Sequence, residues 1–356
     1  MRGFLFLGLM MATVMSAGAQ QTKILSAEKH NEYGLVYTLP TTAFDIEVIV
    51  VKEIRKAGPF YKYASKFAGE TEVVKEDAVS FNIESIKVKP YGIPNPESRY
   101  LMQLKPGSTT YIGVSDDGML LSINKQPKES IPEVPSNLGI EGTPSTGKEY
   151  LDYVNEDFIS AQSSFKQAQL LAEELMEIRD AKISLTRGTA ESMPTDGRQL
   201  ELMLASLDNQ EKALMQAFTG NIWRERLSRT FTFVPDEENR YVLCRLSDFN
   251  GLVDADDYSG DPVYISVKLI ETPELPVDGK GEEKKLPKDA VVYCIPGTAE
   301  LNISFSGKPL FVKSFPMSQF GMTFGLNPTL FTDRKEASYA IFDPSTGALV
   351  ELGVSK

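Results

Sequence analysis

The sequence predicts an α+β protein in which two similar, mainly antiparallel β modules flank an inserted antiparallel helical hairpin. Apolar residues alternate with period two, as in half-buried strands, over residues 20–125 and again over 221–356. Between these parts, residues 148–220 carry apolar residues at helical spacing. The stretch 126–147 is rich in Pro, Ser and Gly, which is typical of a linker.

Residues 1–19 have the features of a secretory signal peptide: Arg2 near the start, an apolar run from Phe4 to Met15, and small residues at Ala17-Gly18-Ala19. We expect cleavage near Ala19 and a periplasmic or secreted mature protein. No Cys lies near that point, so we expect no lipoprotein anchor. No later stretch has the length of apolar residues that a transmembrane helix needs.

The first β module has three recognisable parts. Residues 44–54 and 79–88 alternate apolar and polar side chains, as strands do. Residues 110–123 predict a hairpin with Asp116-Asp117-Gly118 in its turn. Residues 58–69 predict one short helix that ends at Gly69.

The inserted segment predicts two amphipathic helices. The first ends at Gly188, and the second begins near Asp196 with Gln199 as its capping partner and ends at Gly220. Each apolar stripe is about one face wide, which favours packing of the two stripes on each other. The alternative is an exposed hairpin that docks a partner.

The two β modules resemble each other at three places in the same order. Residues 34–52 match 251–268, both opening with Gly-Leu-Val; residues 90–95 match 292–297; and residues 110–123 match 338–352. Matches in the same order indicate an internal duplication. The alternative is that short strands and Gly turns look alike by chance.

The chain has two cysteines, Cys244 and Cys294. In an oxidising compartment an even pair permits one disulfide. The alternative is two separate buried thiols in strands.

Residue counts limit the chemistry that the chain can perform. His30 is the only histidine, so Ser-His-Asp catalysis, Cys-His catalysis and a zinc site of His and Cys clusters are all disfavoured. No phosphate-binding Gly loop and no dinucleotide fingerprint is present. Glycosidase chemistry needs only two carboxylates at a suitable separation, but nothing singles out a pair. The net charge of −12 argues against nucleic acid as a partner.

The acidic stretch 251–267 offers a calcium-site hypothesis. An EF-hand loop that begins at Asp254 would need Gly at Ser259 and Glu at Ile265, and it has neither. The calcium hypothesis is therefore a less regular site in which oxygen atoms of Asp254, Asp256 and Asp261 bind the ion. The alternative is that these residues form a solvated acidic turn without a bound ion. No other cofactor is predicted.

Trp223 follows the second predicted helix, near Phe231 and Phe233. It is a candidate for a sugar-binding surface. The alternative is that the ring packs in the core.

The segments "GPFYKYASKFAG", "PTDGRQLELMLASLDNQEKALMQAFTG" and "DPSTGAL" resemble a family of exported Bacteroidetes proteins of unknown function. The resemblance covers nearly all of the mature chain, and it implies an envelope location without functional residues to carry over. We therefore expect a non-enzymatic binding or scaffold protein with an envelope protein or a glycan as its partner. The alternative is a carbohydrate-active hydrolase that uses an Asp/Glu pair. The sequence assigns no oligomeric state.

Overall fold

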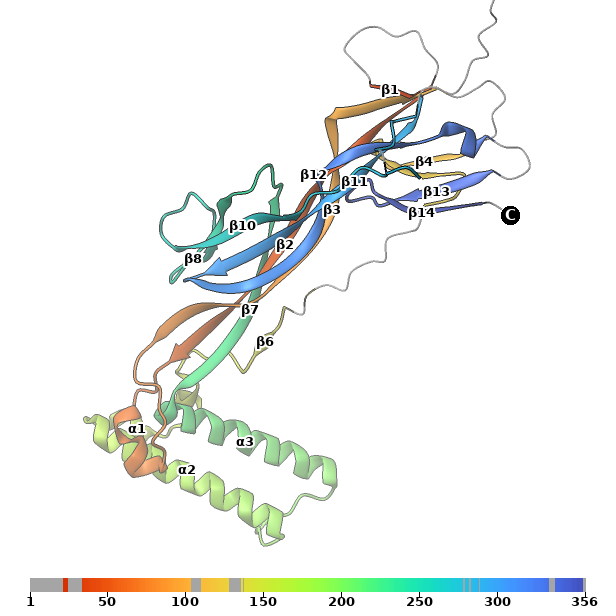
Figure 1. The fold of residues 1–356 in the computed structure, drawn as a ribbon. Coiled ribbons are helices and arrows are strands. Elements are labelled where there is room, and N and C mark those ends of the chain that lie inside the picture. The colour runs from red at the N-terminus through yellow and green to blue at the C-terminus, as the bar shows by residue number, and fades with distance from the viewer. Residues whose placement is uncertain are drawn as a thin grey trace, which may run out of the picture.

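The computed structural model describes residues 22–24, 34–103, 110–127, 136, 138–277, 279–281, 283–287, 289–332 and 337–354. The predicted signal peptide, its cleavage point near Ala19 and His30 lie outside the described residues. The described chain forms three mainly antiparallel sheets and a group of helices, arranged along one long axis (Figure 1). The predicted α+β class is confirmed.

The first sheet has the strand order β1-β3-β2-β7-β6. Its strands are β1 (Thr22–Ile24), β3 (Ala78–Met102), β2 (Leu35–Lys56), β7 (Asn221–Phe233) and β6 (Ile140–Glu141). In β2 the even-numbered side chains from Phe44 to Val50 are buried, because residues two apart share one face of a strand. That face packs against the second sheet.

The second sheet has the order β12-β11-β10-β8-β9. Its strands are β12 (Lys308–Leu326), β11 (Val291–Phe305), β10 (Asp261–Glu271), β8 (Arg240–Ser247) and β9 (Gly251–Val253). The largest core lies between the two sheets, with Phe44 edge-on to Phe315 at 5.1 Å between ring centroids.

The third sheet has the order β14-β13-β5-β4 and pairs the last two strands of the described chain with a hairpin from the first predicted β module. Its strands are β14 (Leu349–Val354), β13 (Ser338–Phe342), β5 (Leu120–Ile123) and β4 (Ile112–Val114). The predicted hairpin at Asp116-Asp117-Gly118 is confirmed as β4–β5, and Gly118 adopts the positive φ of 80° that such a turn favours. A short 3-10 helix, η4 (Pro328–Phe331), covers the adjoining core.

The helices form a head at one end of the molecule. The head comprises α1 (Glu156–Ser160), α2 (Ser164–Arg187), α3 (Gly197–Thr219) and the short turns η1 (Tyr61–Tyr63), η2 (Ala64–Ala68) and η3 (Glu149–Tyr153). The predicted ends are confirmed: Gly188 closes α2 in the left-handed conformation, Asp196 accepts a hydrogen bond from the Gln199 N–H, and Gly220 follows α3. The short helix predicted within 58–69 is a 3-10 turn followed by a π turn, and it ends at Gly69 as predicted.

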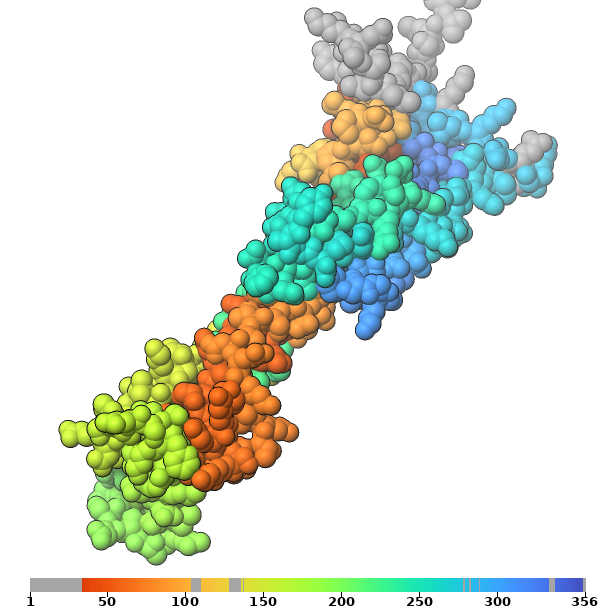
Figure 2. Space-filling model, turned by 90° about the vertical axis from the view of Figure 1, so that its left-hand side faces the viewer, coloured from red at the N-terminus to blue at the C-terminus, as the bar shows by residue number. Residues whose placement is uncertain are grey.

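A narrow stalk joins the head to the sheets (Figure 2). We define the stalk as residues 51–56 of β2, 78–82 of β3 and 221–226 of β7, which lie side by side in register. The N-terminal and C-terminal β modules are therefore not separate in space, because β7 belongs to the second module in sequence and pairs with β2 of the first.

The described C-terminal part of the predicted linker forms a strap beside the stalk. We use this name for residues 136 and 138–147, the part of the linker that the structure describes between the sheets and the head. The Ser136 hydroxyl donates to Glu47 at 2.5 Å and accepts from Lys87 at 2.7 Å, and the Arg226 N–H donates to the Gly139 carbonyl at 3.1 Å. Backbone pairing of β6 with β7 then fixes the strap beside the stalk.

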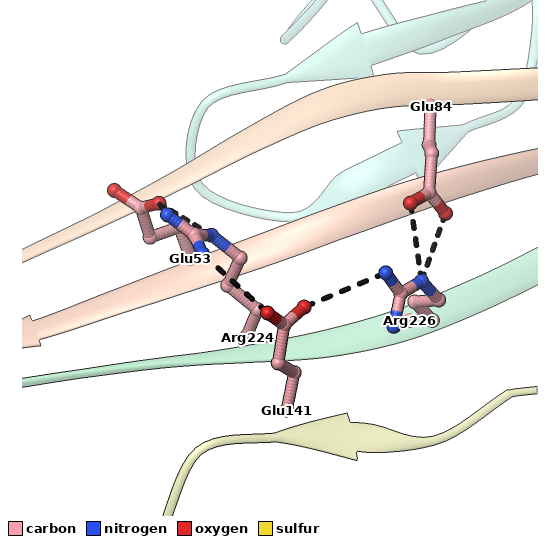
Figure 3. A network of polar contacts seen from close by, with 5 residues as sticks. All are labelled: Glu53, Glu84, Glu141, Arg224 and Arg226. Atoms are coloured by element: carbon pink, nitrogen blue, oxygen red, sulfur yellow. Dashed lines mark hydrogen bonds and ion pairs between the residues drawn. The ribbon is translucent and has the colours of Figure 1, made fainter.

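Five charged side chains hold the strap at this point (Figure 3). Arg224 contacts Glu53 at 2.8 Å and Glu141 of the strap at 4.0 Å. Arg226 contacts Glu84 at 3.0 Å and Glu141 at 3.5 Å. The two arginines thus link β2, β3 and the strap through one continuous network.

The predicted duplication is not confirmed, and the structure changes the segments that it would align. Residues 35–52 lie in one long strand, β2, whereas 251–268 divide into the edge strand β9 and the central strand β10, so this first predicted match is not confirmed. Two backbone hydrogen bonds correspond to each other in the two parts of the chain. The Thr38 N–H donates to the Gly118 carbonyl at 2.9 Å, and the Cys294 N–H donates to the Gly347 carbonyl at 3.0 Å. These contacts align Tyr37–Pro40 with Tyr293–Pro296.

Candidate binding site at the tip of the helical head

The base of the head is well packed. Aromatic and aliphatic side chains from α1, α2, α3 and the turns form one cluster, in which Leu175, Leu214 and Phe218 are fully buried. Phe60 from the loop after β2 lies 6.1 Å from Phe218 between ring centroids. This cluster fixes the head on the stalk.

The distal half of the helix pair is packed less completely. The buried residues of α3 all lie in its C-terminal part: Ala213, Leu214, Ala217 and Phe218. Toward the tip, Leu202 is 63% exposed and Met203 is 37% exposed. The two predicted stripes therefore pack on each other near the base, whereas toward the tip α2 still buries Leu185 and α3 has no buried residue before Ala213.

A groove of about 550 Å³ lies between the distal parts of α2 and α3. Its walls are Ala181, Ser184 and Leu185 from α2, and Met203, Ser206 and Leu207 from α3. On both helices these positions follow i, i+3, i+4 spacing, which places them on one face. The groove exists because Ala and Ser leave space that larger side chains would fill.

The loop between the helices closes the distal end of the groove with Thr189, Ala190, Glu191 and Ser192. Most of the exposed lining is apolar, although the lining also includes the hydroxyl groups of its Ser and Thr residues and the carboxylate of Glu191. A site of this composition suits an apolar side chain better than a charged or a strongly hydrated one.

The other flank of the helix pair is closed by ion pairs. Arg179 contacts Glu211 at 2.7 Å, and Lys182 contacts Glu211 at 2.7 Å and also contacts Asp208. Hydrogen bonds from Lys182 and then from Arg179 hold the pKa of Glu211 below its ordinary value. The helix pair therefore has a charged, closed flank and an apolar, open flank.

The structure does not place Trp223 at a binding surface. Trp223 lies on β7 opposite Ile54 and is only 8% exposed, so a sugar ring cannot stack on it. Its indole N–H has no hydrogen-bond partner among the described residues. The core interpretation of this residue is the one that the structure supports.

The aspartates of the predicted calcium site are not brought together. Asp254 pairs with Arg229, and Asp261 begins β10 opposite Leu246. Within the described ranges, no group of three or more His, Cys, Asp or Glu side chains, Asp256 included, is arranged to hold a metal ion.

The predicted disulfide is absent, because Cys244 and Cys294 are both free and buried. Cys244 lies opposite Val263, and Val263 lies opposite Phe305 of β11. Cys294 is eleven residues from Phe305 on that strand (305 − 294 = 11), which is about 36 Å at 3.3 Å per residue. A disulfide needs Cα atoms within about 7 Å, so these residues cannot pair. Burial raises the pKa of both thiols to about 12.

The three carboxylates of the network in Figure 3 are paired with arginines. Hydrogen bonds from Arg55 and, to a smaller extent, from Arg224 keep the pKa of Glu53 below its ordinary value. A glycosidase pair instead needs one carboxyl whose pKa is raised. The network in Figure 3 therefore fastens the strap and does not present an acid and a base to a substrate.

In the described part of the chain, no helix combines the length and apolar character required to cross a membrane. The fold and the groove together define the class: an elongated α+β protein whose helical head carries an apolar site at its tip.

The chain belongs to the DUF4831 family, a domain of unknown function whose model matches residues 33–350. The match confirms the expectation that the chain belongs to an uncharacterised family. No curated protein and no solved structure matches the chain.

Proposed function

We propose that the protein is a binding or scaffold protein of the cell envelope and that the groove of its head holds an apolar segment of another protein. The observation that carries the proposal is the groove itself, since the same helices are closed by ion pairs on their opposite flank. The envelope location rests on the signal-peptide features of residues 1–19.

A protein partner fits the groove better than a glycan does. Sugar sites present aromatic rings on which the sugar stacks, and the lining of the groove contains no aromatic side chain. An amphipathic helix places apolar side chains at i, i+3, i+4 and i+7 into a groove of this kind. We therefore infer that the partner presents one helical apolar stripe.

The distance between the head and the sheets suits a scaffold. The groove lies between helices of the head, and the head lies at one extremity of the molecule, away from the second and third sheets (Figure 1). A partner docked at the tip would not contact the sheets, which leaves their surfaces free for a second interaction.

The test places a photoreactive amino acid at Met203 in the native host, with and without a second substitution, Ser206→Arg, that fills the groove. The crosslinked partner should be a single protein, and Ser206→Arg should remove it. Ile183→Glu is the matched control, because Ile183 is 43% exposed on the same helix pair but does not line the groove. Thermal melts of the variants confirm that each one folds.

Crosslinking that survives Ser206→Arg, or that Ile183→Glu abolishes equally, contradicts docking in the groove. Turnover of a glycan by the purified protein, unchanged by Ser206→Arg, would favour the hydrolase alternative.

A further inference from the structure

The edges of the three sheets differ in how they are protected against pairing with another strand. An edge strand presents unpaired N–H and C=O groups, and proteins usually block it by shortness, by charge or by proline. Four of the edge strands described are short: β1, β4 and β9 have three residues each, and β6 has two.

The longer edges carry blocking residues. β3 beyond its pairing with β1 contains Lys87, Lys89, Pro90 and Pro94, and β12 contains Lys308, Pro309, Lys313 and Pro316. The strap covers the outer edge of β7 as far as Arg226, and Arg229 follows on the same strand.

β14 is the exception among these edges. Its six residues include no Lys, no Arg and no Pro, and β13 is its only hydrogen-bonded neighbour among the strands that the structure describes. Val350, Leu352 and Val354 are 60%, 48% and 55% exposed and lie on one face, since residues two apart share a face. The strand therefore combines a free edge with an exposed aliphatic row.

The opposite face of β14 is already filled. The Tyr339 hydroxyl donates to Glu351 at 2.6 Å, and Lys125 lies 3.0 Å from Glu351 and 4.1 Å from the centroid of the Tyr339 ring. An added Cβ at Gly353 would meet the Tyr339 hydroxyl at 2.6 Å, so the ring covers Gly353 as well. The one charge on the strand thus has its partners within the same chain.

We propose that β14 pairs antiparallel with β14 of a second copy of this chain. Pairing about Leu352 places Val350 opposite Val354 of the other copy and Glu351 opposite its Gly353. Every contact on the exposed face is then aliphatic. A register centred on Glu351 would place two carboxylates opposite each other, which destabilises a strand pair.

The same surface could instead receive a strand of an unrelated protein, and the self-complementarity of the strand favours a second copy. An interface built around one six-residue strand is smaller than a standard stable interface, so the expected dimer dissociates readily. The third sheet lies at the end of the molecule away from the head, so pairing leaves both grooves accessible (Figure 1). The proposal does not depend on the function proposed for the groove.

The test measures the mass of the full-length protein in solution over a range of concentrations and adds site-directed cysteines. At the centre of the pair, residue 352 faces itself with Cα atoms about 4.5–5.5 Å apart, which is within disulfide range. Leu352→Cys should therefore give a covalent dimer under mild oxidation. Glu351→Cys on the covered face should not, and the native cysteines are buried and do not compete.

Leu352→Lys should weaken self-association by at least about tenfold. Val312→Lys should leave it unchanged, since Val312 is an equally exposed aliphatic residue on the protected strand β12. Circular dichroism confirms folding, and Val354→Lys is a second variant with the same expected effect. Three results would overturn the proposal. The protein stays monomeric at every concentration, Leu352→Lys leaves a dimer intact, or Leu352→Cys forms a disulfide only with a different protein.

Discussion

Replacing Tyr37 by Phe removes one oxygen atom from a contact between distant parts of the chain. Tyr37 lies on β2 and is fully buried, and its hydroxyl donates to the Val292 carbonyl at 3.1 Å and accepts from the Val292 N–H at 2.9 Å. The residues are 255 positions apart in sequence. Both ring faces keep their packing in the variant, including the stacking on Tyr100 at 5.6 Å.

The cost follows from what the hydroxyl leaves behind. Val292 is 6% exposed, so water does not replace the lost partner of its N–H. A net hydrogen bond contributes about 1 kcal/mol, and an unpaired buried group costs about 1–3 kcal/mol. We therefore expect Tyr37→Phe to lower the free energy of unfolding by about 3 kcal/mol.

Urea unfolding and hydrogen exchange at the Val292 amide measure this effect. The amide should exchange faster in Tyr37→Phe than in the wild type. Tyr241→Phe is the control: its hydroxyl donates to Asp236 at 2.7 Å at an exposed site, so water replaces the bond and the loss should be within about 0.5 kcal/mol. Equal losses in the two variants would refute the argument that the Tyr37 contact joins the two halves.

Three further outcomes are expected. Asp196→Ala removes the cap of α3 and should lower stability by about 1 kcal/mol in urea unfolding, and an unchanged midpoint would show that the cap contributes nothing. Although partial burial opposes it, hydrogen bonding led by the Thr146 N–H lowers the pKa of Glu149 to about 2. A lowered pKa contributes stability at pH values above the ordinary pKa, and this contribution is lost as the pH falls toward 2. The free energy of unfolding of Glu149→Gln should therefore differ from that of the wild type above about pH 5 and converge with it near pH 2. Gly220→Ala would place a Cβ 2.5 Å from the Lys56 carbonyl at a positive φ of 78° and should cost at least about 1 kcal/mol, read from the thermal melt; a melt that matches wild type would show that the junction relaxes freely.

The sequence predicted those features that depend on neighbouring residues. The ends of α2 and α3 follow from Gly188, Asp196 and Gly220, each of which bonds within a few residues. The β4–β5 hairpin follows in the same way from Gly118.

Features that depend on distant contacts were not predicted. The apolar stripes of α2 and α3 do not show how closely the two helices pack toward the tip, so the groove could not be predicted from them. The adjacent pair Leu202–Met203 widens the apolar stripe of α3 and was the available sign of an exposed apolar surface there. The separation of Cys244 from Cys294 depends on the register of β8, β10 and β11. Gly-Leu-Val at two places suggested equivalent strands, although one begins a central strand and the other is a short edge strand.

The chain passes between the sheets and the head four times, outward through β2, back through β3, outward again through the strap and back through β7. A head on a single connection would rotate about it. Four connections that lie side by side, joined by backbone hydrogen bonds and by arginine ion pairs, resist both bending and torsion. Tension along the long axis would be shared by these backbones, and the β2–β3 and β2–β7 ladders keep the strands of the stalk side by side. The stalk is therefore a stiff lever, and a load applied at the tip of the head reaches the three sheets with its direction preserved.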